Sequence, residues 1–238
     1  RLLHALLNFL WERLGTQAQL LLLDEAAETS LLEQGWQAAV RTTREAAWLA
    51  PAVLERERRR ALGAMRKVLE LERQRPPFTV AAREQAMQWE GAGARLGLRV
   101  DRVDECEGGA LLIDYKTGSP GTPGLHKGEL KPLQLALYAA ALAQAGRVVR
   151  GTALLALHPS EPGFSGAAAQ ADLLPRGLRP MEDWELAMQQ WQQQLQQLMA
   201  DHLTGTATLA RDPRVCARCH LPALCRRAGP DAAEPEDE

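Results

Sequence analysis

Two carboxylates and one ammonium group are spaced in this sequence so that they could act together on a phosphate. In the stretch RVDRVDECEGGALLIDYKTG, residues 99–118, Asp101 comes first, then Asp114, with Lys116 two positions later. Side chains two residues apart on a strand share a face, so we expect Asp114 and Lys116 to point together. A turn centred between Glu107 and Gly108 would place Asp101 directly opposite Asp114 on the neighbouring strand.

Opposed strand residues have Cβ atoms roughly 4.5–5.5 Å apart, and like charges at that distance repel. A divalent cation between the two carboxylates would remove the repulsion, and Mg²⁺ prefers carboxylate and water oxygens. The same residues could instead form a charged surface ladder, with Asp101 and Arg102 against Asp114 and Lys116. Spacing alone does not decide between the two, although the apolar residues 111–113 favour burial.

The elements that carry these residues read as strands that follow a helical region. Apolar side chains at helical spacing predict a helix over 2–14, and helical patterns continue over 25–50 and 52–75, each ended by proline. Strands are expected at 78–90, 96–105 and 110–116, with a tight turn near 107–109. The remainder is expected to contain a loop at 119–129, a helix at 132–144, a strand at 148–157, an irregular segment at 158–180 and a helix at 183–203. This order predicts an α/β fold with a mixed sheet.

Several segments together resemble one nuclease family. GLRVDRVDE followed by LLIDYKTG resembles the core of PD-(D/E)xK nucleases of the RecB/AddB type, in which a G-x-x-x-D-R-x-D strand precedes a D-Y-K-T-G strand. QLALYAAAL resembles the Q-x-x-x-Y helix of that family, with Gln134 and Tyr138 on one helix face. RLLHALLNFLWERL resembles its first motif. The similarity covers most of residues 1–229, and it extends to a bacterial DNA repair family that carries this nuclease domain at its C-terminus.

The resemblance implies a restriction-endonuclease-like core and a divalent metal site. It implies that Asp101 and Asp114 bind Mg²⁺ or Mn²⁺, and that the Tyr115 carbonyl and His4 complete the protein ligands. On position alone, His4 on its apolar helix reads as a packed core residue. Phosphodiester hydrolysis needs a metal-bound water and positive charge at the phosphoryl oxygens, which these residue types could supply.

The resemblance also assigns roles outside the metal. Lys116 would orient or activate the attacking water, and Gln134 and Tyr138 would support the site or contact the DNA backbone. Glu84 lies where similar proteins carry a Glu before the first Asp strand, although a surface acid is an equal reading. Asp104 is an odd number of residues from Asp101, so we expect it on the other face in a structural role.

Three of the four cysteines lie close together, as Cys216, Cys219 and Cys225 in the pattern C-x₂-C-x₅-C. AddB-type nucleases carry this spacing around a [4Fe–4S] cluster, with a fourth Cys before the first motif; that Cys is missing here, and Cys106 at the strand turn is a poor substitute. Thiolates at this spacing suit iron–sulfur or zinc, so zinc stays an alternative. The C-x-x-C-H pattern of c-type haem attachment is also present but would leave Cys225 unexplained.

Composition bounds the class of protein. Residues 230–238 hold five acids and no base, so we expect an acidic disordered tail, and residues 1–229 carry 28 basic against 25 acidic side chains. No apolar run of 18 residues occurs, and clustered thiols are not a secreted disulfide framework, so we expect a cytoplasmic protein.

The chain starts at Arg1 inside a helical pattern, which suggests the C-terminal part of a longer protein. We expect a nuclease domain over 1–210 (helical 1–77, catalytic sheet and Q-x-x-x-Y helix 78–157, packing helix 181–204), and a Cys-rich segment over 211–229.

The sequence therefore predicts a metal-dependent deoxyribonuclease, an exonuclease or single-strand nuclease in DNA repair and recombination. A helicase-like domain or subunit would be its partner. The alternative is an inactive nuclease-fold module that binds DNA in a helicase–nuclease complex. A redox protein built on the cysteines is a third reading, and it would leave the DYKTG residues without a role.

Overall fold

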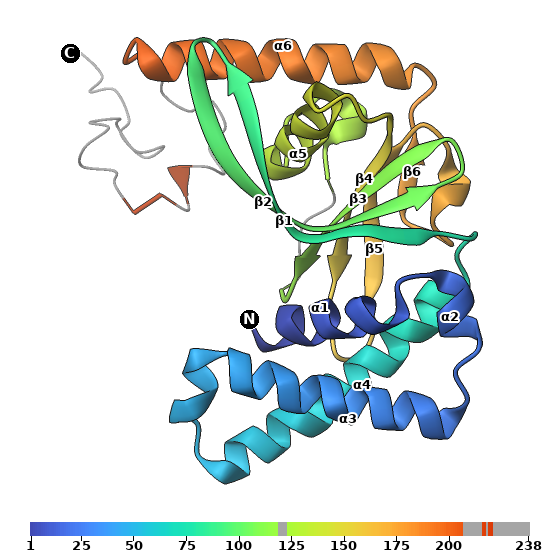
Figure 1. Ribbon diagram of the computed structural model, residues 1–238. Coiled ribbons are helices and arrows are strands. Elements are labelled where there is room, and N and C mark those ends of the chain that lie inside the picture. Colours follow the sequence, from blue (N-terminus) through green and yellow to red (C-terminus); the bar gives the residue numbers. More distant parts are fainter. Residues whose placement is uncertain (119–122, 207–215, 218, 221–238) are drawn as a thin grey trace, which may run out of the picture. The chain divides into compact units, whose positions relative to one another are not determined.

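The computed structural model describes residues 1–118, 123–206, 216, 217, 219 and 220 (Figure 1). The chain divides into two compact units, residues 1–197 and 198–238. The first unit contains the sheet and the residues predicted to act on phosphate. The predicted boundaries at residues 210 and 229 lie outside the described residues and stay predictions.

A layer of helices opens the first unit. It contains α1 (Leu2–Leu14), α2 (Gln17–Leu21), α3 (Glu25–Thr42), the short 3₁₀ helix η1 (Arg44–Trp48) and α4 (Pro51–Arg73). The predicted helix over 25–50 is wrong beyond Thr42. Thr43 is extended there, and the Thr42 hydroxyl donates back to the Ala38 carbonyl at 3.0 Å. Two β-branched threonines with such a local bond weaken helix propagation, so the chain turns into η1.

Six strands form one mixed sheet in the order β1-β2-β3-β4-β5-β6, as the α/β prediction required. They are β1 (Thr79–Gly91), β2 (Ala94–Cys106), β3 (Gly109–Lys116), β4 (Val149–Ala156), β5 (Gly163–Ala168) and β6 (Leu178–Pro180). The first three are antiparallel, and β4 lies parallel to β3 after the crossover helix α5 (Leu133–Gln144). Cys106 pairs with Gly109, which confirms the predicted turn and register between β2 and β3.

The expectation that residues 158–180 are irregular is wrong, because β5 and β6 extend the sheet beyond β4. β5 has six residues, most of them small, and β6 has only three residues, so neither shows the alternation that reveals a strand. Gly166 shows why: a Cβ there would come within 2.2 Å of the Thr152 carbonyl oxygen. Short 3₁₀ helices, η2 (Leu125–Lys127) and η3 (Ala171–Leu173), occupy two of the connections.

Helices cover both faces of the sheet in the first unit (Figure 1). The main core lies between the helical layer and one sheet face, where Leu111, Ile113 and Tyr115 of β3 are buried. Ala-rich α5 covers the other face. The start of α6 (Trp184–Leu203) is fixed by the Trp184 indole, whose Nε1 donates to the Val149 carbonyl at 2.7 Å.

The β1–β2 hairpin is long, and its outer part is held by glutamine side chains. The Glu90 amide donates to Gln144 Oε1 at 3.0 Å, and Gln144 Nε2 donates to the Glu90 carbonyl at 2.8 Å. Near the tip, the Ala92 amide donates to Gln196 Oε1 at 2.6 Å. Among the described helices, none is both long and apolar enough to cross a membrane.

Candidate active site

The middle of β2 and the end of β3 bring Asp101 and Asp114 to one place. The paired ladder between these strands stops at Arg102 and Ile113, one step before the two aspartates. There Asp101 turns its carboxylate onto β3, where Oδ2 accepts a hydrogen bond from the Tyr115 amide at 2.7 Å. This bond ties the first carboxylate directly to the strand that carries the second.

Lys116 is held between Asp114 and the crossover helix. Its Nζ lies 2.6 Å from Asp114 Oδ2 and donates to Gln134 Oε1 at 2.8 Å. Gln134 Nε2 in turn donates to the Tyr138 hydroxyl, one helical turn further along α5. The predicted D-x-K pair and the predicted Q-x-x-x-Y pair therefore form one connected group.

Asp114 is 2% exposed, and its surroundings oppose its charge. Burial raises the pKa of Asp114 above its usual range; Lys116 opposes this shift, and the neighbouring Asp101 carboxylate adds to it. Its Oδ2 has the Lys116 ion pair but no hydrogen bond of good geometry among the described residues. A buried carboxylate oxygen left in this condition is suited to binding a cation.

His4 reaches the same place from α1. Its Nε2 lies 3.0 Å from the Tyr115 carbonyl oxygen and 3.6 Å from Asp101 Oδ2, and its ring meets the Tyr115 ring edge to face. Its Nδ1 is buried without a hydrogen-bond partner in the described part of the chain. His4 is therefore half-buried, with its imidazole facing the carboxylate end of the sheet, and its role as a metal ligand stays a prediction.

The four groups named as metal ligands from the sequence fit a hard divalent cation by their chemistry. Two carboxylates, one backbone carbonyl and one imidazole form an oxygen-rich set, which Mg²⁺ and Mn²⁺ prefer. Within the described residues, no three His, Cys, Asp or Glu side chains form a ready-made metal cluster. Lys116 instead lies against Asp114 and supplies part of the charge compensation that a cation would give, and His4 Nε2 lies 3.6 Å from Asp101 Oδ2.

Glu84 lies level with Asp101 on the edge strand, since Arg83 pairs with Arg102 and Gln85 with Val100. Its φ of 45° is unusual for a residue other than glycine and costs backbone strain. Its nearest cation is Arg99, at 3.8 Å. A strained backbone of this kind persists only when the surrounding structure holds it in place, so the packing around the β1–β2 hairpin must fix the conformation of Glu84.

A cleft of about 640 Å³ connects these residues. His4, Glu84 and Asp101 line it from α1 and the β1–β2 hairpin. The segment before and within η1 lines it from the helical layer, with Arg44 and Glu45. The Asp101 and Glu84 carboxylates are therefore reachable from solvent through a space large enough for a phosphate and its neighbouring sugar.

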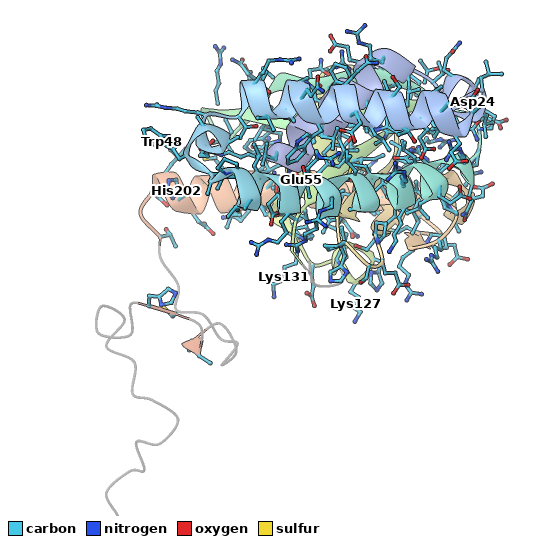
Figure 2. The ribbon with its side chains drawn as sticks, turned by 90° about the horizontal axis from the view of Figure 1, so that it is seen from below. Asp24, Trp48, Glu55, Lys127, Lys131 and His202 are labelled. Carbon is cyan, nitrogen blue, oxygen red and sulfur yellow. The ribbon has the colours of Figure 1, made fainter. Side chains whose placement is uncertain are left out.

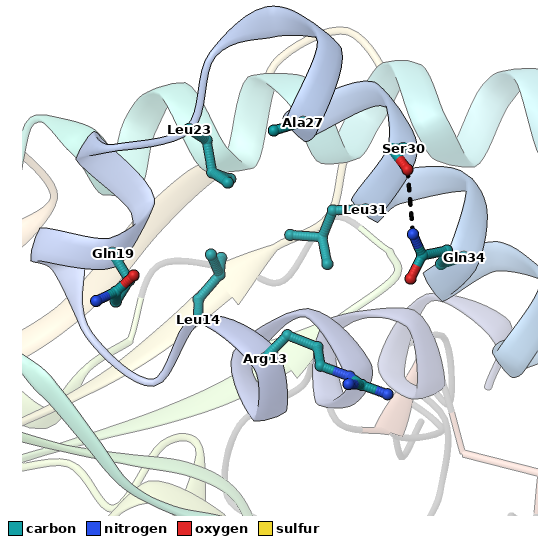
Figure 3. Close-up of a pocket in the computed structure, with 8 residues that line it drawn as sticks. All are labelled: Arg13, Leu14, Gln19, Leu23, Ala27, Ser30, Leu31 and Gln34. Atoms are coloured by element: carbon teal, nitrogen blue, oxygen red, sulfur yellow. Dashed lines mark hydrogen bonds between the residues drawn. The ribbon is translucent and has the colours of Figure 1, made fainter.

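A second pocket, of about 340 Å³, lies among α1, α2 and α3 (Figure 3). Leu14, Leu23 and Leu31 point into it, and Gln34 Nε2 donates to the Ser30 hydroxyl at 3.1 Å. Arg13 is the one charged residue among those that line it. That lining contains no carboxylate, imidazole, thiol or lysine amine, so this pocket offers no chemistry comparable to that of the cleft beside Asp101.

Comparison with known proteins agrees with the site. The family model described as the PD-(D/E)XK nuclease superfamily matches residues 1–226. The chain belongs to this superfamily. Among curated proteins, none matches the sequence. A solved structure titled "Crystal structure of SSO0001" is similar over 94% of this chain and 82% of its own, at 13% identity and a TM-score of 0.35, which is too low to carry an argument.

Membership in the PD-(D/E)XK nuclease superfamily indicates a hydrolase that acts on nucleic acids, and nucleases of this superfamily generally use Mg²⁺ or Mn²⁺. Asp101, Asp114 and Lys116, which the sequence predicts to act together, lie close to one another at the end of β3. Their roles in the reaction stay predictions.

Behind the nuclease site lies a buried ionic network that the sequence did not reveal. Arg102 donates to Asp104 through Nε at 2.6 Å and to Glu72 through Nη1 at 2.7 Å. Arg75 contacts Glu72 at 2.6 Å and Asp104 at 2.8 Å, and all four side chains are fully buried. Asp104 faces away from Asp101, as predicted, and its partners are structural. The alternation of β2 thus sends Asp101 to the cleft and Arg102 and Asp104 into the core.

The cysteine predictions are only partly covered by the described residues. Cys216 and Cys219 are exposed, and Cys225 lies outside the described residues, so the iron–sulfur cluster and the zinc alternative stay predictions. Cys106 ends β2, where its Sγ is 3.9 Å from Arg75 Nη2. Burial raises the pKa of the Cys106 thiol above its usual range, which favours the neutral form.

Proposed function

We propose that this PD-(D/E)XK protein is a metal-dependent deoxyribonuclease that hydrolyses phosphodiester bonds where the middle of β2 meets the end of β3. The observation that supports this most strongly is the position of Lys116. Its amine is fixed between the buried Asp114 carboxylate and the Gln134 side chain, beside Asp101. A lysine that served only a surface ion pair would not need a second partner on another element.

Each group has a distinct task in the proposed reaction. Asp101, Asp114, the Tyr115 carbonyl and His4 would hold Mg²⁺ or Mn²⁺, which when bound lowers the pKa of water and withdraws charge from the phosphate. Lys116 donates a hydrogen bond to the attacking water or to a phosphoryl oxygen, where negative charge develops. Gln134 accepts from Lys116 and so aims its amine, and Tyr138 holds the Gln134 amide in turn.

The biological setting is part of the same proposal and rests on the sequence resemblance. The RecB/AddB type implies an exonuclease or single-strand nuclease in DNA repair and recombination, in the cytoplasm, with a helicase-like domain or subunit as partner. A [4Fe–4S] cluster or zinc at Cys216, Cys219 and Cys225 would be a structural cofactor.

The test is degradation of end-labelled linear DNA by the purified chain with Mg²⁺ or Mn²⁺, with EDTA as the metal-free arm. We expect cleavage that EDTA stops and that the Lys116→Ala protein lacks. Lys131→Ala is the matched control, because Lys131 is an exposed lysine on the loop that leads into α5. A folded wild-type chain without metal-dependent cleavage would instead support the inactive DNA-binding module.

A further inference from the structure

We propose that the cleft beside Asp101 receives a single DNA strand, and that Trp48 stacks on an unpaired base of that strand as it enters. The proposal rests on the proposed nuclease function and adds the form of the substrate and a residue that binds it. It is drawn from the exposure of one side chain and from its place on η1.

Trp48 differs from every other tryptophan in the chain. Five of the six tryptophans are at most 5% exposed: Trp11, Trp36, Trp89, Trp184 and Trp191. Trp48 is 83% exposed, and Leu49 beside it is 37% exposed. Leaving an indole in water forgoes a large burial energy, so a surface tryptophan in a chain with only six suggests a contact with something outside it.

The geometry of η1 places Trp48 on the helix face that borders the cleft, beyond the lining residue Glu45. A 3₁₀ helix has three residues per turn, so side chains at i and i+3 lie on one face. Glu45 lines the cleft and pairs with Arg1, which also lines it. Trp48 is three residues after Glu45 and therefore extends the same face by one turn. Figure 2 shows Trp48 at the outer edge of the helical layer.

Cationic side chains line the cleft between η1 and Asp101. Arg44 on η1 and Arg99 on β2 are exposed and line it on opposite sides. Arg99 lies two residues from Asp101 and so on the same face of β2. A nucleic-acid backbone that runs from Trp48 to Asp101 would pass both guanidinium groups, which neutralise phosphates in the manner usual for single-strand channels.

The expected ligand is a single strand because a tryptophan face needs an unstacked base. In a duplex the base faces are already stacked on each other, whereas in a single strand any base can stack on an indole. Stacking is also tolerant of sequence, as a general nuclease requires. A protein partner covering Trp48 is the competing explanation, and the experiment below separates the two.

The experiment measures binding in EDTA, which stops metal-dependent cleavage, by fluorescence anisotropy. The probes are a labelled oligothymidylate, an abasic oligomer of the same length and a blunt duplex. We expect Trp48→Ala to weaken oligothymidylate binding by about five- to 100-fold, the range of one lost base stack, and to leave abasic-oligomer binding unchanged. Trp48→Phe should retain most of the affinity. Arg44→Gln should weaken both single-stranded probes and lower the salt dependence of binding by about one charge.

Leu22→Ala is the matched control, since Leu22 is 77% exposed and lies between α2 and α3, away from the cleft lining. The proposal is overturned if Trp48→Ala binds oligothymidylate as tightly as wild type, which would leave Trp48 to a protein interface. It is also overturned if wild type binds the duplex more tightly than the single strand, or binds neither. Failure of the nuclease proposal looks different: oligothymidylate binding that depends on Trp48, without cleavage in Mg²⁺ or Mn²⁺.

Discussion

The Asp101 carboxylate accepts a hydrogen bond from the Tyr115 amide at 2.7 Å, across the point where the β2–β3 ladder ends. The Asp101 side chain therefore takes the place of a backbone carbonyl as acceptor and joins β2 to β3 at the candidate active site. The bond satisfies an amide that would otherwise lose its partner, and it leaves the second oxygen of Asp101 available to the cleft. Asp101 therefore has a structural role, the hydrogen bond to Tyr115, and a proposed role as a metal ligand. A substitution that keeps the hydrogen bond but removes the charge can separate the two roles.

Asp101→Asn keeps a side-chain oxygen for the Tyr115 amide but removes the charge. We expect the fold to be retained, Mn²⁺ affinity to fall at least about tenfold and cleavage to be lost, because ligand charge sets the affinity for hard cations. Isothermal titration with Mn²⁺ and the DNA degradation assay measure the two effects. Asp172→Asn, on exposed η3, should change neither. Unchanged Mn²⁺ affinity in the Asp101 variant would contradict its role as a ligand.

Lys116→Ala should lower the cleavage rate by about 100-fold or more, the usual loss when one donor to developing charge is removed. Mn²⁺ affinity should hold or rise, because Asp114 loses a competing cation. Gln134→Leu should give a smaller loss of rate, since it removes only the group that aims the amine. Single-turnover rates with saturating Mn²⁺ separate these effects from binding. Equal rates for Lys116→Ala and wild type would remove Lys116 from the mechanism.

Arg102→Leu should destabilise the protein by about 3–5 kcal/mol, because it leaves Glu72 and Asp104 buried with too little positive charge. Urea unfolding followed by far-UV circular dichroism measures the change. Arg59→Gln, which breaks only an exposed pair with Glu55, should have a much smaller effect. If the two variants unfold alike, the buried network does not stabilise the fold as we infer.

The same network predicts a loss of stability in acid. Burial opposes the charge on Glu72, but Arg102 and Arg75 outweigh it and lower the pKa of Glu72 below its ordinary value of 4.5. A group whose pKa is lower in the folded state stabilises the fold above its unfolded pKa. The stabilisation is complete above about pH 4.5 and is lost as the pH falls toward the folded value.

Urea midpoints measured between pH 3 and pH 7 would show this fall in the wild type. Glu72→Gln removes the titrating group, so its midpoint should start lower at neutral pH and depend less on pH below 4.5. A Glu72→Gln protein with the same acid dependence as wild type would assign the effect to other carboxylates.

Local periodicity was enough to predict the strands that carry Asp101, Asp114 and Lys116, since alternation with a period of two sets which side chains share a face. The β2–β3 register followed from the turn at Glu107 and Gly108. Elements without a local signal were missed. Strand β5 is rich in small residues, β6 has only three residues, and the end of α3 coincides with hydrogen bonds from the Thr42 hydroxyl to the Ala38 and Ala39 carbonyls.

Contacts between residues far apart in the sequence could not be predicted from local sequence patterns, for a different reason. Glu72 and Arg102 are thirty residues apart and on different elements, and only the packed fold makes them partners. His4 is the instructive case within the site. Its place on an apolar helix favours burial, and only the approach of α1 to the end of β3 turns its ring toward the Tyr115 carbonyl. The resemblance assigned His4 and the Tyr115 carbonyl to one metal site, and the structure places them 3.0 Å apart, which periodicity could not predict.

The two hydrogen bonds between the Gln144 side chain and the Glu90 backbone have a consequence for aggregation at high protein concentration. Strand β1 is an outer strand of thirteen residues, and such a strand invites the same strand of another molecule to pair with it. Gln144 occupies both backbone groups of Glu90, and the left-handed backbone of Glu84 interrupts the line of hydrogen-bonding groups further along. A strand interrupted at both places is a poor template for fibril growth. The distortion beside the cleft thus also helps the protein avoid aggregation.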